Sequence, residues 1–100
     1  MSKYSLTDEA IQDINEICDY LSNFNLDAAN KFLNSIEQKC QNLAKFPNMG
    51  RSYAELSPEL RGVTLNDYII FYRLISNEVE IIRVVNGYRN LESLFSDSDD

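Results

Sequence analysis

Histidine and tryptophan are both missing from this 100-residue chain, and glycine, proline and cysteine number only three, two and two. Without histidine, the side chain that most often serves as a general base near neutral pH is not available. The glycines are isolated from one another, so no glycine-rich loop that could cradle a phosphate is present. Carboxylates such as Glu78 and Glu80 show no metal or glycosidase signature. We therefore expect neither a cofactor nor a metal site.

Long hydrophobic runs are lacking as well. No apolar stretch approaches the ~18 residues that cross a bilayer, and the first nine residues, MSKYSLTDE, are too polar for a signal peptide. With 44% hydrophobic residues and no low-complexity tract, the chain is expected to be a cytoplasmic globular protein with no membrane partner. Its length suits one domain with its own core. We assign residues 1–96 to that domain and 97–100 to an acidic tail that we expect to be disordered.

The two cysteines, Cys18 and Cys40, fall on the apolar stripes of two predicted helices. In an antiparallel hairpin that turns about Asn25 and Leu26, the two side chains would be offset along the helix axis by on the order of 10 Å. That separation is beyond the reach of a disulfide. We expect two reduced thiols that pack in the interior.

Acidic residues outnumber basic ones, and the formal net charge is −7. The charge is unevenly distributed, because all four lysines lie within residues 1–50 and all five arginines within residues 51–96. Arginine suits forked contacts with carboxylate or phosphate, so the C-terminal half could meet an anionic partner despite the acidic total. The open alternative is that the arginines cover apolar surface and pair with nearby acids.

The first half of the chain predicts one short strand and two helices. Residues 3–6 form the strand, and Thr7 is placed to cap the helix that follows. Apolar residues recur every three or four positions in residues 8–24 and again in 27–46, which is typical of helices with one buried face. Pro47 ends the second helix, and a turn and a polar loop extend to residue 59.

The last third of the chain is its most informative part. Residues 60–65, 68–75 and 78–85 are rich in β-branched and aromatic residues, and two-residue polar breaks separate them, as in β-hairpins. Residues 90–95 could add one or two helical turns. The predicted fold is α+β: an N-terminal strand, an antiparallel helical hairpin packed on one face of a mainly antiparallel four-stranded sheet in the order β-α-α-β-β-β, and a short C-terminal helix.

The two tight hairpins fix a register and so sort the sheet residues by face. The face assigned to the helices carries Arg61, Val63, Leu65, Tyr68, Ile70, Tyr72, Leu74, Val79, Ile81, Arg83 and Val85. The second face carries Gly62, Thr64, Ile69, Phe71, Arg73, Ile75, Glu80, Ile82, Val84 and Asn86, with Arg73 and Glu80 opposed as an ion pair. A helical hairpin covers only one face, so the second is expected to expose an apolar patch that marks a partner site. Alternatively, the loop 47–59 or the C-terminal segment folds over it.

A series of short motifs extends over about 90 residues of the chain. It consists of Tyr4-x-Leu6-Thr7-x-x-Ala10-x-x-Asp13-Ile14-x-x-Ile17, Ala29-x-x-Phe32, Leu43-x-x-Phe46-Pro47-x-x-Gly50-Arg51, Leu60-Arg61, Tyr68-x-Ile70-x-Tyr72-Arg73, Ile81-Ile82-Arg83-Val84-Val85-Asn86-Gly87-x-Arg89-Asn90 and Leu94-Phe95. This order resembles the RelE/ParE superfamily of toxins from type II toxin–antitoxin systems. The third and sixth motifs are closer to its ParE-like branch.

The resemblance to ParE-like proteins implies a bacterial, plasmid-stabilising toxin that binds DNA gyrase, traps its cleaved DNA and performs no covalent chemistry. It also implies a cognate ParD-like antitoxin and a toxin–antitoxin hetero-oligomer. We expect the antitoxin to lie on the second sheet face, at Ile69, Phe71, Arg73, Ile75, Ile82, Val84 and Asn86. We expect the target to contact the basic turn, at Arg83, Tyr88 and Arg89.

The RelE-like branch, which cuts mRNA on the ribosome, is one alternative. Such cleavage needs a proton acceptor, a proton donor and cations for the developing phosphorane charge. The candidates here would be Arg89, Tyr88 and Arg83. By resemblance, Phe95 stands where such a nuclease carries a tyrosine, and Ile69 where it carries a cation, so the chain is poorly equipped for this reaction.

A second alternative is a degenerate, non-toxic family member that only binds its antitoxin. Asn86 stands where ParE-like chains commonly carry a histidine, which leaves this alternative open. Tyr88 could act as an acid beside Arg89, although tyrosines at strand ends more often pack with a hydrated hydroxyl.

Overall fold

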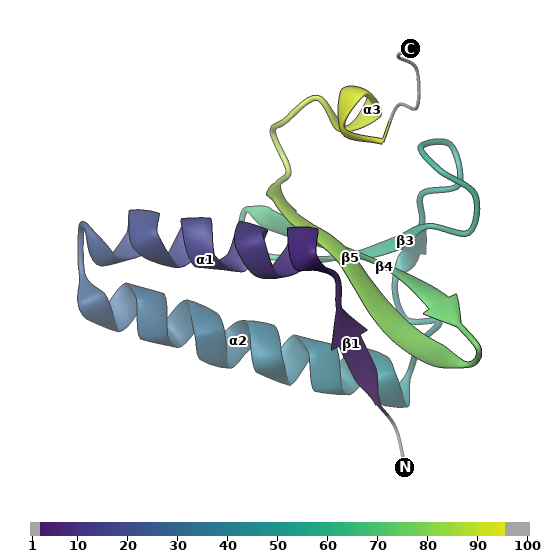
Figure 1. Ribbon diagram of the computed structural model, residues 1–100, viewed down its shortest axis with the longest axis horizontal. Helices are drawn as coiled ribbons and strands as arrows, with labels where there is room; N and C mark the ends of the chain where they lie inside the picture. The colour runs from purple at the N-terminus through teal and green to yellow at the C-terminus, as the bar shows by residue number, and fades with distance from the viewer. Residues whose placement is uncertain (1–2, 96–100) are drawn as a thin grey trace.

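The computed structural model describes residues 3–95, within which the chain forms three helices and five strands (Figure 1). The strands are β1 (Tyr4–Leu6), β2 (Arg51–Ser52), β3 (Arg61–Leu65), β4 (Tyr68–Ile75) and β5 (Glu78–Asn86). The helices are α1 (Asp8–Ser22), α2 (Leu26–Lys45) and α3 (Leu91–Leu94). The predicted fold class is confirmed. The acidic tail predicted for 97–100 lies outside the described residues.

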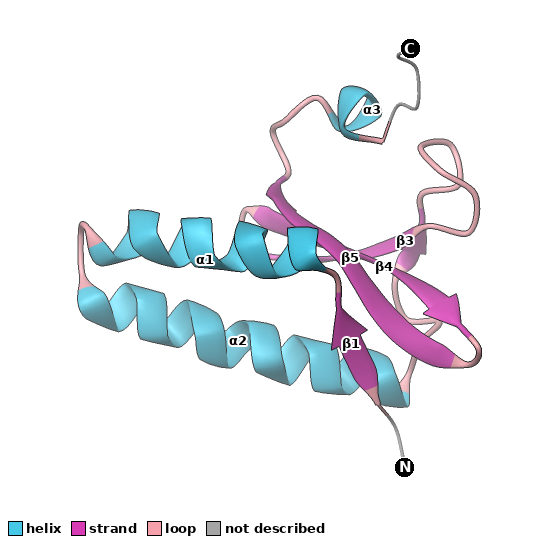
Figure 2. Cartoon of the chain, viewed as in Figure 1, coloured by secondary structure: helices cyan, strands magenta, loops and turns pink. Residues whose placement is uncertain are grey.

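All five strands belong to one mixed sheet, in the order β1-β5-β4-β3-β2. The pairs β2–β3, β3–β4 and β4–β5 are antiparallel, and β1 runs parallel to β5. The prediction of four strands is wrong by one, because the two residues of β2 pair with Arg61 and Gly62. Figure 2 shows α1 and α2 side by side, with β1 leading directly into α1.

Both long helices begin at side-chain caps. The Thr7 hydroxyl accepts a hydrogen bond from the Ala10 N–H at 3.0 Å, and the Asn25 side chain accepts one from the Asp27 N–H at 2.8 Å. Each helix turns its apolar stripe toward the sheet, as the spacing predicts. The buried residues of this main core are Ala10, Ile14, Phe32, Ile36, Cys40, Leu43, Ile70, Tyr72, Val79, Ile81 and Val84.

The turn between α2 and β2 is fastened by the hydroxyl of Tyr72. This hydroxyl donates a hydrogen bond to the Pro47 carbonyl at 2.6 Å and accepts one from the Gly50 N–H at 3.0 Å. A Cβ atom at position 50 would lie 2.5 Å from the same hydroxyl and 2.8 Å from the Gly62 carbonyl oxygen. Only glycine fits there, which gives the Pro47-x-x-Gly50 motif a structural reason.

The cysteines are free thiols, as predicted. Cys40 is buried, whereas Cys18 is only partly buried. Burial raises the pKa of the Cys40 thiol to about 11, so this thiol stays protonated and unreactive at neutral pH.

Strand β5 contains a β-bulge that the sequence does not reveal. Phe71 lies opposite Arg83 and the next residue, Tyr72, lies opposite Ile81, so the register skips Ile82. An extra residue of this kind reverses the alternation of side chains beyond it. The predicted faces are therefore wrong after the bulge. The residues concerned are Val84 and Asn86, which lie on the helix side, and Val85, which lies on the other side.

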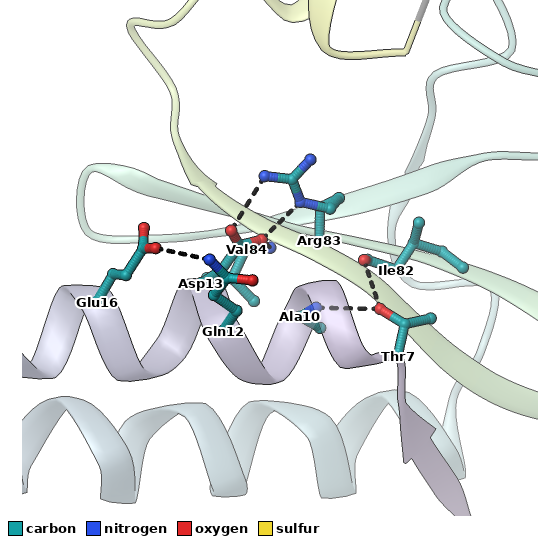
Figure 3. A network of polar contacts seen from close by, with 8 residues as sticks. All are labelled: Thr7, Ala10, Gln12, Asp13, Glu16, Ile82, Arg83 and Val84. Atoms are coloured by element: carbon teal, nitrogen blue, oxygen red, sulfur yellow. Dashed lines mark hydrogen bonds and ion pairs between the residues drawn. The ribbon is translucent and has the colours of Figure 1, made fainter. Parts of the chain in front are cut away.

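Helix α1 takes the place of a neighbouring strand along the bulged part of β5. Strand β1 ends at Leu6, opposite Ile81, and the chain then turns into the helix. Immediately beyond, the Thr7 N–H donates to the Ile81 carbonyl at 3.0 Å. The Thr7 hydroxyl donates to the Ile82 carbonyl at 2.8 Å (Figure 3). The N-cap residue of α1 thus also continues the hydrogen bonding of the sheet edge.

The carboxylate of Asp13 completes this junction. Its Oδ2 accepts hydrogen bonds from the Val84 N–H at 2.9 Å and from Arg83 Nε at 2.7 Å, and its Oδ1 accepts one from Arg83 Nη2 at 3.0 Å (Figure 3). The two side chains are only 23% and 10% exposed for Arg83 and Asp13. A forked and largely buried ion pair therefore joins α1 to the bulge.

The second sheet face is covered, so the prediction of an exposed apolar patch is wrong. Phe71 and its neighbours form a second buried cluster with Leu60, Ile69 and Val85. The loop before β3 and the α3 segment cover this cluster with Tyr53, Leu56, Leu91, Leu94 and Phe95. The rings of Tyr53 and Phe95 meet the Phe71 ring edge-on, with centroids 5.0 and 4.9 Å away. The alternative in which the loop and the C-terminal segment fold over this face is correct.

Arg73 helps to hold that loop. It lies opposite Glu80, as predicted, but its guanidinium donates to the Pro58 carbonyl at 3.2 Å and to the Ser57 hydroxyl. The ion pair expected between Arg73 and Glu80 is not formed within residues 3–95.

We expect Asp13→Ala to destabilise the protein, because the variant leaves both the Arg83 guanidinium and the Val84 N–H without their partner. Removing one member of a largely buried ion pair costs about 3 kcal/mol, and the free energy of unfolding from urea titration should fall by this order. The matched control is Glu55→Ala, which breaks the Arg51–Glu55 pair, whose side chains are 60% and 59% exposed. The control should change the free energy by about 0.5 kcal/mol or less. Equal losses in the two variants would contradict the role assigned to Asp13.

We expect Phe71→Ala to lower the free energy of unfolding by about 3 to 4 kcal/mol, because the ring is fully buried in the second cluster. Ile75→Ala is the control on the same strand, since Ile75 is 50% exposed, and it should cost less than about 1 kcal/mol. Urea or thermal unfolding measures both. A Phe71 variant as stable as the wild type would mean that this face is open in solution.

Candidate functional site

The residues predicted to bind the target lie where β5 ends and the chain turns toward α3. Arg83 points to α1 and is held by Asp13, Tyr88 is almost fully exposed, and the exposed Arg89 lines a depression beside α1. The hydrogen bond to Asp13, opposed by burial, raises the pKa of Arg83 above its ordinary value. Arg83 is therefore a permanently charged structural partner, and Arg89 and Tyr88 are the members of the trio that face solvent.

The depression beside Arg89 has a volume of about 310 Å³. It lies between α1 and the end of β5. Its lining consists of Asp13, Glu16, Ile17, Tyr20, Tyr68, Val84, Val85, Asn86 and Arg89.

A second depression of about 470 Å³ adjoins the first, because three residues line both. The shared residues are Tyr20, Tyr68 and Asn86. The rest of its lining comes from α1, α2 and the turn between β3 and β4, with Leu21, Ala28, Lys31, Phe32, Ser35, Asn66 and Asp67. We call the two depressions together the trough.

The chemistry available in the trough suits binding. Burial, then Tyr20 and Asp67, raises the pKa of Tyr68, so its phenol stays protonated at neutral pH. Asp13 is engaged by Arg83 and by a backbone N–H. Among residues 3–95, no group of three or more histidine, cysteine or acidic side chains is placed to hold a metal ion.

An apolar groove lies at a different place, between the first half of α1, the middle of α2 and β1. Its volume is about 320 Å³, and its lining consists of Tyr4, Leu6, Ile11, Ile14, Asn15, Leu33, Ile36, Glu37 and Cys40. Leu6, Ile11 and Leu33 are each more than a third exposed. Strand β1 is also an edge strand of the sheet, so its outer side has no neighbouring strand within the described chain.

The seven residues predicted to bind the antitoxin do not form one accessible surface. Ile69, Phe71 and Val84 are buried, and Arg73, Ile82 and Asn86 are partly buried. Ile75 alone among the seven is exposed. The antitoxin-binding role of these residues stays a prediction.

Two positions compared above with ribosome-dependent nucleases serve packing in this chain. The ring of Phe95 lies edge-on against Phe71, and Ile69 is buried in the same cluster. Neither position presents a polar group to a bound substrate.

Asp13 is the important residue to which the sequence analysis assigns no role, although it belongs to the first of the short motifs. A signal was present. Asp13 follows Ala10 by three positions and precedes Ile17 by four, so it falls on the same helix face as two inward residues. A carboxylate at such a position needs a partner, and arginine is the usual one.

None of the helices within residues 3–95 is both long and apolar enough to cross a bilayer.

Comparisons with known proteins agree with this geometry. Residues 4–91 match a family described as the ParE toxin of the type II toxin–antitoxin system parDE. Toxin ParE3 of Caulobacter vibrioides is 34% identical over 73 residues, which are 73% of each chain. A chain from a solved chromosomal ParDE system of P. aeruginosa has the same fold, with a TM-score of 0.72, 24% identity, and coverage of 86% of this chain and 96% of that one. The chain belongs to the ParE toxin family of type II toxin–antitoxin systems.

Proposed function

We propose that this chain arrests growth by binding DNA gyrase and stabilising its cleaved DNA, with no covalent chemistry of its own. We further propose that a ParD-like antitoxin neutralises it in a hetero-oligomer, in the cytoplasm of a bacterial cell. Membership of the ParE family supports the toxin class.

One observation supports the proposal that the toxin is not catalytic: the side chains at the positions that a nuclease would use have structural roles in this chain. Arg83 is bound by Asp13, while Phe95 and Ile69 are packed in the second cluster. Cleavage of RNA would need an acid, a base and free cations near one point. The basic turn offers one cation, Arg89, and one exposed phenol, Tyr88, which suits contact with a partner surface better than proton transfer.

For the antitoxin we propose the apolar groove between α1, α2 and β1. An amphipathic segment that lies on Leu6, Ile11 and Leu33 would remove exposed apolar side chains from water. The outer edge of β1 could also pair with an extended segment of the antitoxin. Binding on the second sheet face would instead require displacement of the loop and of α3 from a buried cluster.

We expect the purified protein to cause linear DNA to accumulate when it is added to DNA gyrase, supercoiled plasmid and ATP, and the reaction is stopped with detergent and protease. Arg89→Ala should need about tenfold more protein for the same effect, because the exposed guanidinium would contact the target directly. Arg51→Ala is the matched control, since Arg51 is an exposed arginine on β2, away from the basic turn.

Two results would contradict this proposal. Growth arrest on expression without linear DNA in the assay would indicate ribosome-dependent mRNA cleavage. Neither arrest nor linear DNA would indicate a family member that only binds its antitoxin.

We expect Leu33→Glu to weaken binding of the cognate antitoxin by about tenfold or more, because it places a charge in the apolar groove. Isothermal titration calorimetry with the purified antitoxin measures the dissociation constant. Ile75→Glu is the matched control, because Leu33 and Ile75 are 44% and 50% exposed and Ile75 belongs to the sheet residues predicted from sequence. If only the Ile75 variant lost binding, the antitoxin site would be assigned to the second sheet face and not to the apolar groove.

A further inference from the structure

The end of the helical hairpin at which α1 leads into α2 carries three exposed apolar side chains, from the last turn of α1, the connecting turn and the start of α2. Phe24 is 72% exposed, and Tyr20 and Leu26 are each more than half exposed. The rings of Tyr20 and Phe24 meet edge-on with centroids 5.1 Å apart. We call Tyr20, Phe24 and Leu26 the hairpin tip. In Figure 1 this end of the hairpin is at the far left, remote from β1.

The fold makes no use of the hairpin tip. None of its three residues belongs to the main core or to the second cluster. A polar turn would join the helices equally well, since Asn25 already caps α2 through its side chain. Adjacent large apolar groups in water on a small protein mark a surface that another molecule covers.

The hairpin tip is continuous with the trough and separate from the apolar groove. Tyr20 lines both depressions of the trough, and Arg89 stands in the lining of one of them. The groove uses Ile11 to Asn15 on α1 and Leu33 to Cys40 on α2. The trough extends along the same helices as far as Asp13 and Ser35, but no residue lines both the trough and the groove. One helical hairpin therefore presents two distinct surfaces, of which only the trough continues to the hairpin tip.

The charges around the tip and trough decide what kind of molecule fits there. Apart from the Asp13–Arg83 pair, the side chains that line the trough or flank the tip include four carboxylates and two cations. The carboxylates are those of Glu16, Asp19, Asp27 and Asp67, and the cations are Lys31 and Arg89. A mainly acidic surround disfavours phosphate groups and favours a basic protein surface.

We propose that the hairpin tip and the trough form the surface that binds the toxin's target protein, at an apolar pocket bordered by lysine or arginine residues. Phe24 is the anchor that enters this pocket, and Arg89 marks the far limit of the contact. This inference rests on the proposed toxin function and deepens it, because it assigns the target to the tip and trough and the antitoxin to the separate apolar groove.

The test compares Phe24→Ser with Phe46→Ser, since Phe46 is a phenylalanine of similar exposure, at 64%, that follows the opposite end of α2. Immobilised toxin is titrated with purified DNA gyrase in biolayer interferometry, with and without linear duplex DNA. The same variants are titrated with antitoxin, expressed in cells to score growth arrest, and checked by circular dichroism. Phe24→Ser should weaken gyrase binding about tenfold or more and relieve the arrest, with antitoxin binding unchanged. Phe46→Ser should match the wild type.

A charge variant tests the acidic surround independently. Asp19→Lys should also weaken gyrase binding without DNA, because it places like charge against a basic pocket. Tighter binding in this variant that appears only with DNA would assign the surface to nucleic acid and overturn the inference.

Other outcomes separate the inference from the function on which it rests. Full toxicity of Phe24→Ser, or loss of its antitoxin binding, would overturn the inference and leave the toxin function standing. A wild-type dimer that Phe24→Ser dissociates would assign the tip to a second copy of this chain. Growth arrest by the wild type without gyrase binding would overturn only the identification of gyrase as the target. In that case, the growth of cells that express Phe24→Ser would still show whether the hairpin tip binds the target. Absence of any arrest would overturn both.

Discussion

The carboxylate of Asp13 is the constraint on which the arrangement of the functional surfaces depends. It binds the Arg83 guanidinium in a fork and the Val84 N–H on the open edge of β5. Together with Thr7, it supplies hydrogen bonds to the part of β5 that β1 is too short to reach. A bulged strand edge in an apolar environment would otherwise leave polar backbone groups unpaired, at a substantial cost in free energy.

That junction determines what the basic turn can do. Arg83 is bound to α1 through Asp13, and Val84 is buried in the main core. As a result, Asn86 and Arg89 line the trough together with Tyr20. The turn keeps one accessible cation, Arg89. Under the proposed function this cation contacts the target, and growth arrest follows from what the bound target can no longer do.

The sequence predicts well whatever is encoded locally. Helix periodicity, the Thr7 cap, Pro47 after α2 and the two-residue hairpin turns place nearly every element, because each depends on residues within a few positions. The bulge at Ile82 depends on a hydrogen bond that the Thr7 hydroxyl donates to Ile82 and on one that the Asp13 carboxylate accepts from Val84, and both partners are about 70 residues away in the chain. Alternation along β5 therefore gave the wrong face for Val84 and Val85. The prediction of an exposed second sheet face is wrong for a similar reason. The loop is polar and the last helix is short, so neither indicates from sequence that it packs on the sheet. The contact between Phe95 and Phe71 depends on tertiary packing.

The short distance between the groove and the hairpin tip also bears on how neutralisation would work under the proposed function. Helix α1 has 15 residues and is therefore only about 22 Å long. An antitoxin in the groove would stand within that distance of the hairpin tip. A target enzyme much larger than this 11.5 kDa chain could not reach the tip and the trough without meeting the antitoxin. Steric exclusion would then neutralise the toxin even though the two partners share no contact residue, and substitutions at the tip would separate toxicity from antitoxin binding.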